Sequence, residues 1–256
     1  MNIQILGAHN IESENSRLVS LLIDDVLAID TGALTSSLSF TAQQKLKALL
    51  LTHQHYDHIR DIPSIGMNFT LHNNTLEIYT TQPVYDALAA HLLNDEIYRN
   101  FMEKPPEKPT FRFTVIDPNT TVQIGDYSVL TVPVNHSVPT VGYQITSADG
   151  KTVFFTSDTG PGLADCWRQV SPELLITEVT APDSYGEFAH QAGHLTPGLL
   201  RKELESFRDI KGYLPQVVLV HMNPLEEKEI EAEIAGVARA LDAKIQLGYE
   251  GMRIEI

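Results

Sequence analysis

Short, continuous apolar runs bounded by Gly or Asp recur through the first third of the chain. They read "NIQILG", "RLVSLLI", "VLAIDTG" and "KALLLT". Apolar runs of this length without alternation are typical of strands that are buried on both faces of a sheet. Because a sheet with two buried faces is covered by helices, these runs favour an α/β fold.

The rest of the chain alternates between helical and strand patterns. We expect helices at about residues 58–69, 83–93, 162–170, 195–208 and 225–241. We expect strands at about residues 76–80, 111–116, 121–125, 127–134, 140–146, 152–158, 173–179, 216–221 and 244–249. The Pro-rich stretch 101–111 is a connection in which a helix must stop. The alternation again predicts sheets covered by helices.

Length and charge limit the classes of function. A chain of 256 residues forms one generous domain or at most two small ones, and we expect a single domain over residues 1–256. The net charge of −15 argues against a protein that coats nucleic acid or an anionic membrane, because those surfaces are bound by Lys and Arg. A small anionic substrate remains compatible, since bound metal ions reverse the local field.

The single cysteine and the lack of a long apolar stretch indicate the cellular compartment of the protein. Cys166 is the one cysteine, so no internal disulfide forms, and we interpret it as a small buried residue rather than a reactive thiol. The first ten residues lack the basic and apolar regions of a signal peptide, and no stretch reaches the ~20 apolar residues of a membrane helix. We therefore expect a soluble, cytoplasmic protein.

Three histidines and an aspartate lie within six residues of each other in "THQHYDHI". His53 and His55 follow a strand-like run two residues apart, so in extended chain their imidazoles point to the same side. Asp57 and His58 offer a second pair after the chain turns. A lone histidine is usually a solvated or hydrogen-bonded residue, but a group of this kind at a strand end indicates a metal site.

This stretch resembles the HxHxDH signature of the metallo-β-lactamase superfamily. The resemblance implies an αββα sandwich of two mixed sheets flanked by helices, with a two-metal site whose remaining ligands end later strands. His136 ends "YSVLTVPVNH", Asp158 ends "TVFFTSD", and His221 ends "QVVLVH", in the superfamily's order. The resemblance therefore spans nearly the whole chain.

The resemblance also implies a ligand assignment. One metal ion is assigned His53, His55 and His136. The other is assigned Asp57, His58 and His221, and Asp158 bridges the two ions. Nitrogen and oxygen ligands suit Zn²⁺, which we expect, and also Mn²⁺ or Fe. Asp30, in "LAIDTG", either orients a ligating imidazole or forms a turn.

The stretch "AGHLTP" helps to distinguish between the types of reaction that members of this superfamily catalyse. It resembles the His-x-Thr that phosphodiesterases of the superfamily carry before a helix, including the tRNA 3′-processing endonucleases. Upstream, "LLITEVTAPD" resembles their Glu-x-(Ser/Thr), so Glu178 is expected to pair with His194. The alternative for His194 is a residue at a helix N-terminus, with Thr196 or Gly193 supplying the cap.

Other stretches resemble the class II cyclic-nucleotide phosphodiesterases. They are "HLLNDEIYRNF" with its Pro-rich tail, "FFTSDTGPG…LADCW" and "ITEVTAP…GHLTP". The motif departs from that family's pattern at Tyr56 and Asp61. The resemblance implies a dinuclear phosphodiesterase that cleaves a cyclic nucleotide or similar small phosphodiester with a hydroxide held between the metal ions.

The resemblance gives roles to individual side chains of such an enzyme. Asp57 holds the proton of the nucleophile as well as binding metal, and His194, oriented by Glu178, protonates the leaving oxygen. Tyr143 either lines the substrate pocket or points inward from its strand. His9 follows the first strand, and its side chain is either a substrate contact or structural.

Two alternative functions stay open at the level of sequence. One is a lactone or thioester hydrolase of the same superfamily, and the other is a non-hydrolytic di-iron protein. We expect a small anionic phosphodiester as the partner, with no membrane, and the charge disfavours RNA. The sequence leaves the oligomeric state open between a monomer and a homodimer.

Overall fold

Two seven-stranded mixed sheets form the framework of the computed structural model, which describes residues 1–256. Each sheet belongs to one compact unit of the chain. Unit 1 contains Met1–Gly7, Arg17–Asp117 and Glu250–Glu255. Unit 2 contains Ala8–Ser16, Pro118–Tyr249 and Ile256. The expectation of a single domain over residues 1–256 stays a prediction.

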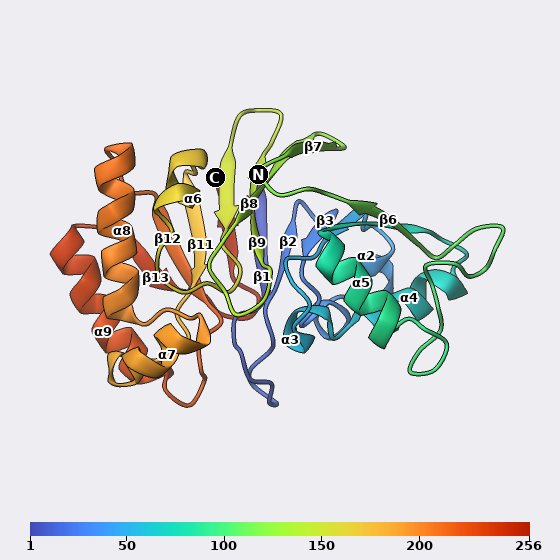
Figure 1. The fold of residues 1–256 in the computed structure, drawn as a ribbon, viewed down its shortest axis with the longest axis horizontal. Coiled ribbons are helices and arrows are strands. Elements are labelled where there is room, and N and C mark those ends of the chain that lie inside the picture. The colour runs from blue at the N-terminus through green and yellow to red at the C-terminus, as the bar shows by residue number, and fades with distance from the viewer. The chain divides into compact units, whose positions relative to one another are not determined.

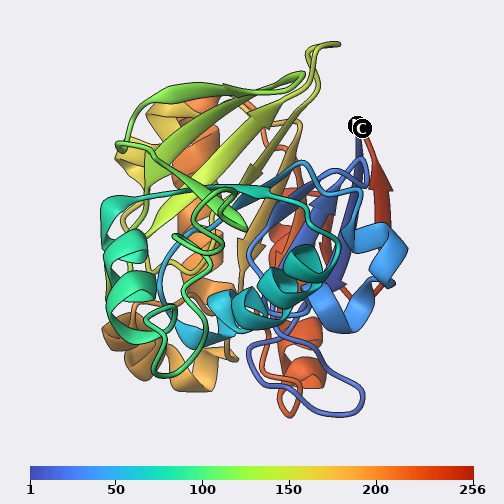
Figure 2. The same ribbon diagram turned by 90° about the vertical axis from the view of Figure 1, so that its right-hand side faces the viewer.

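The sheet of unit 1 has the strand order β14-β1-β2-β3-β4-β5-β6. Its strands are β1 (Asn2–Gly7), β2 (Ser20–Ile23), β3 (Leu27–Ile29), β4 (Ala48–Leu50), β5 (Leu76–Thr80), β6 (Phe111–Val115) and β14 (Arg253–Glu255). Neighbours from β14 to β3 are antiparallel, and neighbours from β3 to β6 are parallel. The two chain ends lie side by side in Figure 2, because Asn2 of β1 is paired with Glu255 of β14.

Five helices accompany this sheet. They are α1 (Leu34–Ser37), α2 (Phe40–Gln43), α3 (Tyr56–Ile59), α4 (Ile62–Leu71) and α5 (Gln82–His91). Both longer helices carry a Pro in their first turn, where its missing N–H costs nothing. Ile62, Ile65 and Phe69 of α4 are buried in the apolar core that the strands share, and α5 adds Val84 and Leu88.

The sheet of unit 2 has the order β13-β12-β11-β10-β9-β8-β7. Its strands are β7 (Thr121–Ile124), β8 (Tyr127–Pro133), β9 (Val141–Thr146), β10 (Thr152–Phe155), β11 (Leu174–Glu178), β12 (Gln216–Val220) and β13 (Ile245–Leu247). Neighbours from β7 to β10 are antiparallel, and neighbours from β10 to β13 are parallel. The parallel strands therefore end along the same edge of the sheet, where polar side chains follow them.

The helical segments of unit 2 are α6 (Ala164–Gln169), η1 (Asp183–Tyr185), α7 (Gly186–Ala192), α8 (Pro197–Lys211) and α9 (Glu227–Leu241). Helix α8 packs against both α6 and α9, and Figure 1 shows these three helices together beside the sheet of unit 2. The Thr196 side chain caps α8 by accepting from the Leu199 amide, and Gly212 ends it in a left-handed conformation. None of the chain's helices is long and apolar enough to cross a membrane.

A buried glutamate ties the segment after β10 to helix α8. Glu203 of α8 accepts hydrogen bonds from the Gly162 amide (2.7 Å), the Leu163 amide (3.1 Å) and the indole Nε1 of Trp167 (3.2 Å). A buried carboxylate persists only when its oxygens are hydrogen-bonded in this way. Glu203 thus fixes the course of the chain shortly after Asp158.

Most of the predicted elements are confirmed, and the differences are short elements. The strands expected from residue 76 to residue 249 match β5 to β13, and the predicted helix at 58–69 is divided into α3 and α4. Strand β14, which has three residues and forms through its pairing with β1, was not predicted. The four-residue helices α1 and α2 and the seven-residue helix α7, which has little apolar periodicity, were not predicted either.

We expect Phe207→Ala to destabilise the protein strongly. Phe207 of α8 has no exposed surface, and its ring centroid lies 5.4 Å from those of Trp167 and Tyr213. Truncating a buried Phe costs about 3–5 kcal/mol in the free energy of unfolding, which urea denaturation measures. The control is Phe188→Ala, at a side chain 70% exposed, which we expect to change stability by less than about 0.5 kcal/mol. Equal losses in both variants would contradict the packing argument.

We expect the thiol of Cys166 to be unreactive in the folded protein. Its side chain is buried, and burial, followed by the nearby charge of Glu203, raises the pKa of the thiol far above its usual range. Since the thiolate is the reactive form, a disulfide reagent at pH 8 should label no thiol in the folded chain and one thiol in urea. Rapid labelling of the folded protein would show that the interpretation as a buried residue is wrong.

Candidate metal centre

The loop after β4 carries the histidine group of unit 1. The ring of His53 lies 4.7 Å from that of His55 and 4.2 Å from that of His58, measured between centroids. His53 and His58 have no exposed surface. His55 directly precedes helix α3, whose first turn holds Asp57, with Oδ2 3.5 Å from Nε2 of His58. Unit 1 therefore brings together the four predicted ligands of the opening motif.

Asp30 follows β3 and is hydrogen-bonded to this group. Its carboxylate accepts from the Thr52 amide (2.9 Å), the Thr52 hydroxyl (2.9 Å) and Nδ1 of His58 (2.7 Å). Burial raises the pKa of Asp30, although the His58 and Thr52 contacts lower it. Asp30 has a φ of +55°, so both sequence alternatives describe it: it makes a turn, and it orients an imidazole.

Backbone contacts hold helix α3 against the segment after β3. The Thr31 amide donates to the carbonyl of His58 (2.7 Å), and the Thr31 hydroxyl donates to the same oxygen (3.0 Å). A Cβ added to Gly32 would lie 2.5 Å from the carbonyl oxygen of Asp57, so only glycine allows this approach. The positions of Asp57 and His58 thus depend on close backbone packing.

Unit 2 brings the later predicted ligands together after β8, β10 and β12. Oδ2 of Asp158 lies 3.2 Å from Nε2 of His221 and 4.0 Å from Nε2 of His136. Nδ1 of His136 donates to the carbonyl of Gly193 (2.9 Å). Burial lowers the pKa of His136, although Asp158 raises it, which favours the neutral ring. A neutral ring with its proton on Nδ1 carries its lone pair on Nε2, the nitrogen nearer Asp158.

Glu178, at the end of β11, accepts four hydrogen bonds from protein donors. Oε1 accepts from the Thr159 amide (2.8 Å) and Nδ1 of His194 (2.7 Å). Oε2 accepts from the Leu195 amide (3.1 Å) and the Thr180 hydroxyl (2.6 Å). Glu178 has no exposed surface, so these donors stabilise a charge that water does not reach.

His194 lies beside two of the predicted ligands. Its ring is stacked on that of His221, with centroids 5.2 Å apart and planes 16° apart. Its centroid lies 5.0 Å from that of His136. The predicted pairing of His194 with Glu178 is present as a 2.7 Å contact, and Thr196 is the residue that caps α8. His194 therefore has a defined orientation next to the groups that follow β8 and β12.

Two of these strand ends also contain backbone in a strained conformation. Ser157, next to Asp158, has a φ of +60°, and His221 has a φ of +63°. Left-handed backbone at a residue with a side chain costs on the order of 1–3 kcal/mol and is retained where the surroundings enforce it. Around His221, the Met222 amide donates to the Ala8 carbonyl (3.2 Å), and the Val179 amide donates to the Val220 carbonyl (3.1 Å).

The donor chemistry of these groups fits a divalent cation. Imidazole nitrogen and carboxylate oxygen are the common ligands of Zn²⁺ and related ions, and two ligands of one ion lie roughly 3–4 Å apart. The contacts of Asp158 with His221 and His136 fall in this range. Glu178, His194 and His221 also converge, but both oxygens of Glu178 accept hydrogen bonds, so we assign that cluster to the hydrogen-bond network.

Comparisons with known proteins agree with this geometry. Residues 21–222 match the family model described as "Beta-lactamase superfamily domain". The chain belongs to the metallo-β-lactamase superfamily. Its structure is similar to that of unliganded yeast PDE1, with a TM-score of 0.84 and 16% identity over 100% of this chain and 99% of the other.

Two curated proteins are similar in sequence. An octanoyltransferase of Porphyromonas gingivalis is 23% identical over 83% of this chain, and a ribonuclease Z of Thermococcus kodakarensis is 25% identical over 63% of it. The chain spans only 38% and 54% of the length of these relatives. The predicted fold of two mixed sheets with flanking helices, the metallo-β-lactamase fold, is confirmed.

Two further residues were predicted to contact substrate. Tyr143 lies on β9 and has no exposed surface, so it occupies the inward position that the sequence left as the alternative. His9 is 4% exposed, pairs through its backbone with Met222, and has Nε2 3.6 Å from Glu227. Substrate contact by either residue stays a prediction.

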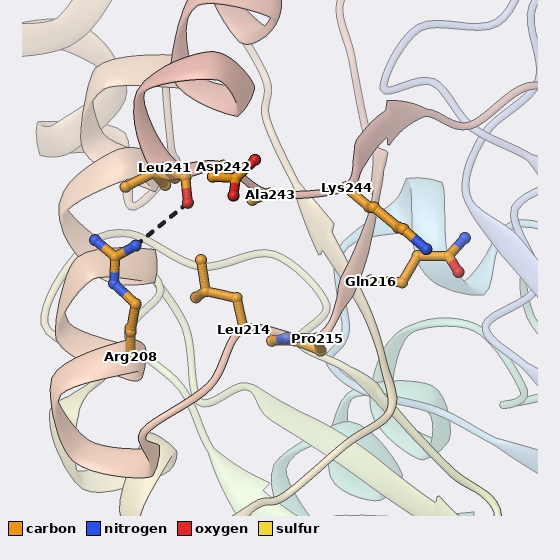
Figure 3. A pocket seen from close by; sticks show the side chains of 8 residues that line it. All are labelled: Arg208, Leu214, Pro215, Gln216, Leu241, Asp242, Ala243 and Lys244. Atoms are coloured by element: carbon orange, nitrogen blue, oxygen red, sulfur yellow. Dashed lines mark hydrogen bonds between the residues drawn. The ribbon is translucent and has the colours of Figure 1, made fainter.

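A hollow of about 560 Å³ lies elsewhere in unit 2 and has a different chemistry. Its lining includes Gln216, the first residue of β12, and Lys244, just before β13, so it lies at the opposite strand ends from His221. In Figure 3 the guanidinium of Arg208 reaches the carbonyl of Leu241, at 3.2 Å, and so caps the C-terminus of α9. The hollow contains no histidine or glutamate, and we assign it no part in the metal centre.

Two residues of the network, Thr52 and Thr180, had no predicted role, and Gly193 was predicted only as a possible helix cap. Thr52 precedes the histidine motif, Thr180 is the Thr of the Glu-x-Thr stretch, and Gly193 provides the carbonyl that binds His136. A hydroxyl residue next to a ligand motif is a weak signal, because Thr is common at strand ends. The backbone carbonyl of Gly193 gives no signal in residue type at all.

We expect Glu178→Gln to destabilise the protein, although the Gln side chain has nearly the same size and shape as that of Glu. All four partners of the Glu178 oxygens are donors, so either orientation of a Gln amide places its NH₂ against two of them. Each buried donor left unsatisfied costs about 1–3 kcal/mol, which chemical denaturation measures as a lower free energy of unfolding.

The matched control for this change is Glu205→Gln on α8. The Glu205 side chain is 40% exposed and paired with Arg201 four residues earlier, and a surface pair contributes about 0–1 kcal/mol. An unchanged stability in Glu178→Gln, or the same loss in both variants, would contradict the assignment of Glu178 as a carboxylate surrounded by donors.

Proposed function

We propose that the chain is a dinuclear metal-dependent phosphodiesterase that acts on a cyclic nucleotide or a similar small phosphodiester. The metals are two divalent ions, with zinc expected. The proposal keeps the ligand assignment that the superfamily motif implies, with Asp158 as the bridging ligand. The superfamily match supports this assignment, because the matched residues 21–222 contain all seven assigned ligands.

The observation that carries the proposal is the 2.7 Å contact between Glu178 and Nδ1 of His194. A carboxylate acceptor holds one imidazole proton on Nδ1, so the proton that the ring can give up is the one on Nε2. The stacking on His221 places this proton donor beside an assigned metal ligand. An alkoxide such as a ribose oxygen is a poor leaving group, so its departure needs such a proton.

The bound ions supply stabilisation of negative charge and ionisation of a water molecule at neutral pH. The protein's own groups supply the rest. Asp57 accepts the proton of the attacking water, and His194 gives its Nε2 proton to the departing oxygen while Glu178 holds the ring. The Leu195 and Thr159 amides bind Glu178 and prevent its rotation.

The chain's likeness to class II cyclic-nucleotide phosphodiesterases directs the choice of substrate. The stretches around Asp158 and His194 carry this resemblance, and the fold of yeast PDE1 is compatible with it. A phosphodiester is an anion, and it is attracted to a site where divalent cations outweigh the surrounding carboxylates. Cytoplasmic location and a monomer or homodimer remain parts of the proposal.

We expect His194→Ala to keep its metal content and to lose turnover on substrates with poor leaving groups. General acid catalysis contributes about 10²–10⁴ in rate, so kcat for a cyclic nucleotide should fall by this factor. Turnover of bis(p-nitrophenyl) phosphate should fall less, because nitrophenolate leaves without a proton. Metal analysis and steady-state kinetics measure both quantities.

The control is His190→Ala, an exposed histidine on α7, which should retain wild-type kinetics. Unchanged kinetics in His194→Ala would remove His194 from the mechanism. Hydrolysis of a lactone or thioester, with no action on any phosphodiester, would replace the proposal by an acyl hydrolase. A redox-active di-iron centre without hydrolysis of any substrate would show that the protein is not a hydrolase.

A further inference from the structure

In each unit a threonine hydroxyl lies between a buried carboxylate and an imidazole. In unit 1 the Thr52 hydroxyl is 2.9 Å from Oδ2 of Asp30 and 3.0 Å from Nδ1 of His53. In unit 2 the Thr180 hydroxyl is 2.6 Å from Oε2 of Glu178 and 2.8 Å from Nδ1 of His221. The same three groups therefore occur in the same order in both units.

The positions of the protons follow from which groups can donate. A hydroxyl has one proton, and an ionised carboxylate only accepts. The Thr180 hydroxyl therefore donates to Glu178 and must accept from His221, whose proton is then on Nδ1. By the same argument the Thr52 hydroxyl donates to Asp30 and accepts from Nδ1 of His53.

Each carboxylate thus acts on two imidazoles. Asp30 accepts directly from Nδ1 of His58 and reaches His53 through Thr52. Glu178 accepts directly from Nδ1 of His194 and reaches His221 through Thr180. The direct contact in each pair provides an internal reference for the relayed one; in unit 2 the Thr180 hydroxyl also lies 3.3 Å from Nδ1 of His194, farther than the 2.7 Å bond of that nitrogen to Glu178.

We infer that Thr52 and Thr180 are positioning residues that fix the tautomer and ring orientation of His53 and His221 for metal binding. The inference rests on the metal-binding part of the proposed function. With the proton held on Nδ1, each neutral ring presents its lone pair on Nε2, which is the form that binds a metal ion.

The surroundings of His221 agree with this role. Its Nε2 lies 3.2 Å from Oδ2 of Asp158. With the His221 proton on Nδ1, a lone pair faces a carboxylate oxygen, and this arrangement is favourable only when a cation or a proton lies between the two atoms. The Thr180 hydroxyl therefore prepares the pair formed by His221 and Asp158 to hold a cation.

The test compares Thr180→Val and Thr52→Val, which remove the hydroxyl at nearly constant volume, with Thr180→Ser and Thr52→Ser, which keep it. The first readout is ¹⁵N–¹H NMR of the histidine rings in the metal-free protein, which reports the tautomer of each ring. The second is the affinity for Zn²⁺, measured by competition with a chelator.

We expect each Val variant to lose the Nδ1–H tautomer of its own histidine and to bind Zn²⁺ about 10–100-fold more weakly. In Thr180→Val, His194 should keep its Nδ1–H form, since its bond to Glu178 is direct. His58 should do the same in Thr52→Val because it is bonded to Asp30. Both Ser variants should recover affinities close to wild type.

Matched controls are Thr177→Val and Thr80→Val, which remove buried, hydrogen-bonded hydroxyls at the ends of β11 and β5 without touching a histidine. They should lower stability without changing ring tautomers or Zn²⁺ affinity. An unchanged tautomer in the Val variants, or Ser variants as weak as Val, would overturn the inference.

The NMR readout distinguishes this inference from the proposed function. If the wild-type protein hydrolyses no phosphodiester, the proposed reaction fails while the tautomers still test the threonines. If His53 and His221 in the wild-type protein carry their protons on Nε2, the threonine inference fails whatever the enzyme's activity.

Discussion

The hydrogen bonding of two buried carboxylates determines the arrangement of the candidate site. Glu178 has no exposed surface, and a charge in that position is tolerated only because four donors surround it. Those donors come from the segment after β10, from the end of β11 and from the segment before α8. One carboxylate therefore joins three parts of the chain that are distant in sequence, and Asp30 does the same for β3 and the loop after β4.

Parallel strands make this convergence possible. In the register of β10, β11 and β12, Phe155 lies opposite Ile176 and Glu178 lies opposite Val220. The residues that follow these strands therefore leave the sheet at the same edge, where ligands bind in α/β folds generally. The left-handed backbone of Ser157 and His221 turns the chain directly after the strand ends. Its strain is offset by the surrounding hydrogen bonds, so the assigned ligands keep one orientation.

Residue types in the sequence predicted the candidate site, and apolar runs predicted the fold. The candidate ligands could be predicted because several side chains of metal-binding types in one short stretch are rare in a structural loop; they are His53, His55, Asp57 and His58. The strands were found because their apolar runs are continuous, as the fully buried β11 shows. These signals are local, and a single sequence is enough to read them.

Features that depend on three-dimensional geometry could not be predicted from the sequence. For Asp30 the sequence left two roles open, a turn and the orientation of an imidazole, because nothing local shows which imidazole a carboxylate will contact. In the structure Asp30 has both roles. Thr52 and Thr180 act through the direction of a single proton, and Gly193 acts through its carbonyl. Strand β14 exists because β1 offers an edge, which three residues alone do not indicate.

In the proposed function, bound metal ions reconcile the acidic character of the chain with an anionic substrate. The net charge of −15 repels anions at long range, but salt screens exposed charges beyond a Debye length of about 8–10 Å. Within that distance the field depends on the groups at the strand ends, where Asp158 faces His221 and His136. Without cations the Asp158 carboxylate disfavours the phosphodiester of the proposed function, and the cations of that proposal reverse the local sign. In the proposed function, metal loading therefore controls the binding of substrate as well as its chemistry. The histidines held by Thr52 and Thr180 link the assigned metal ligands to the two buried carboxylates.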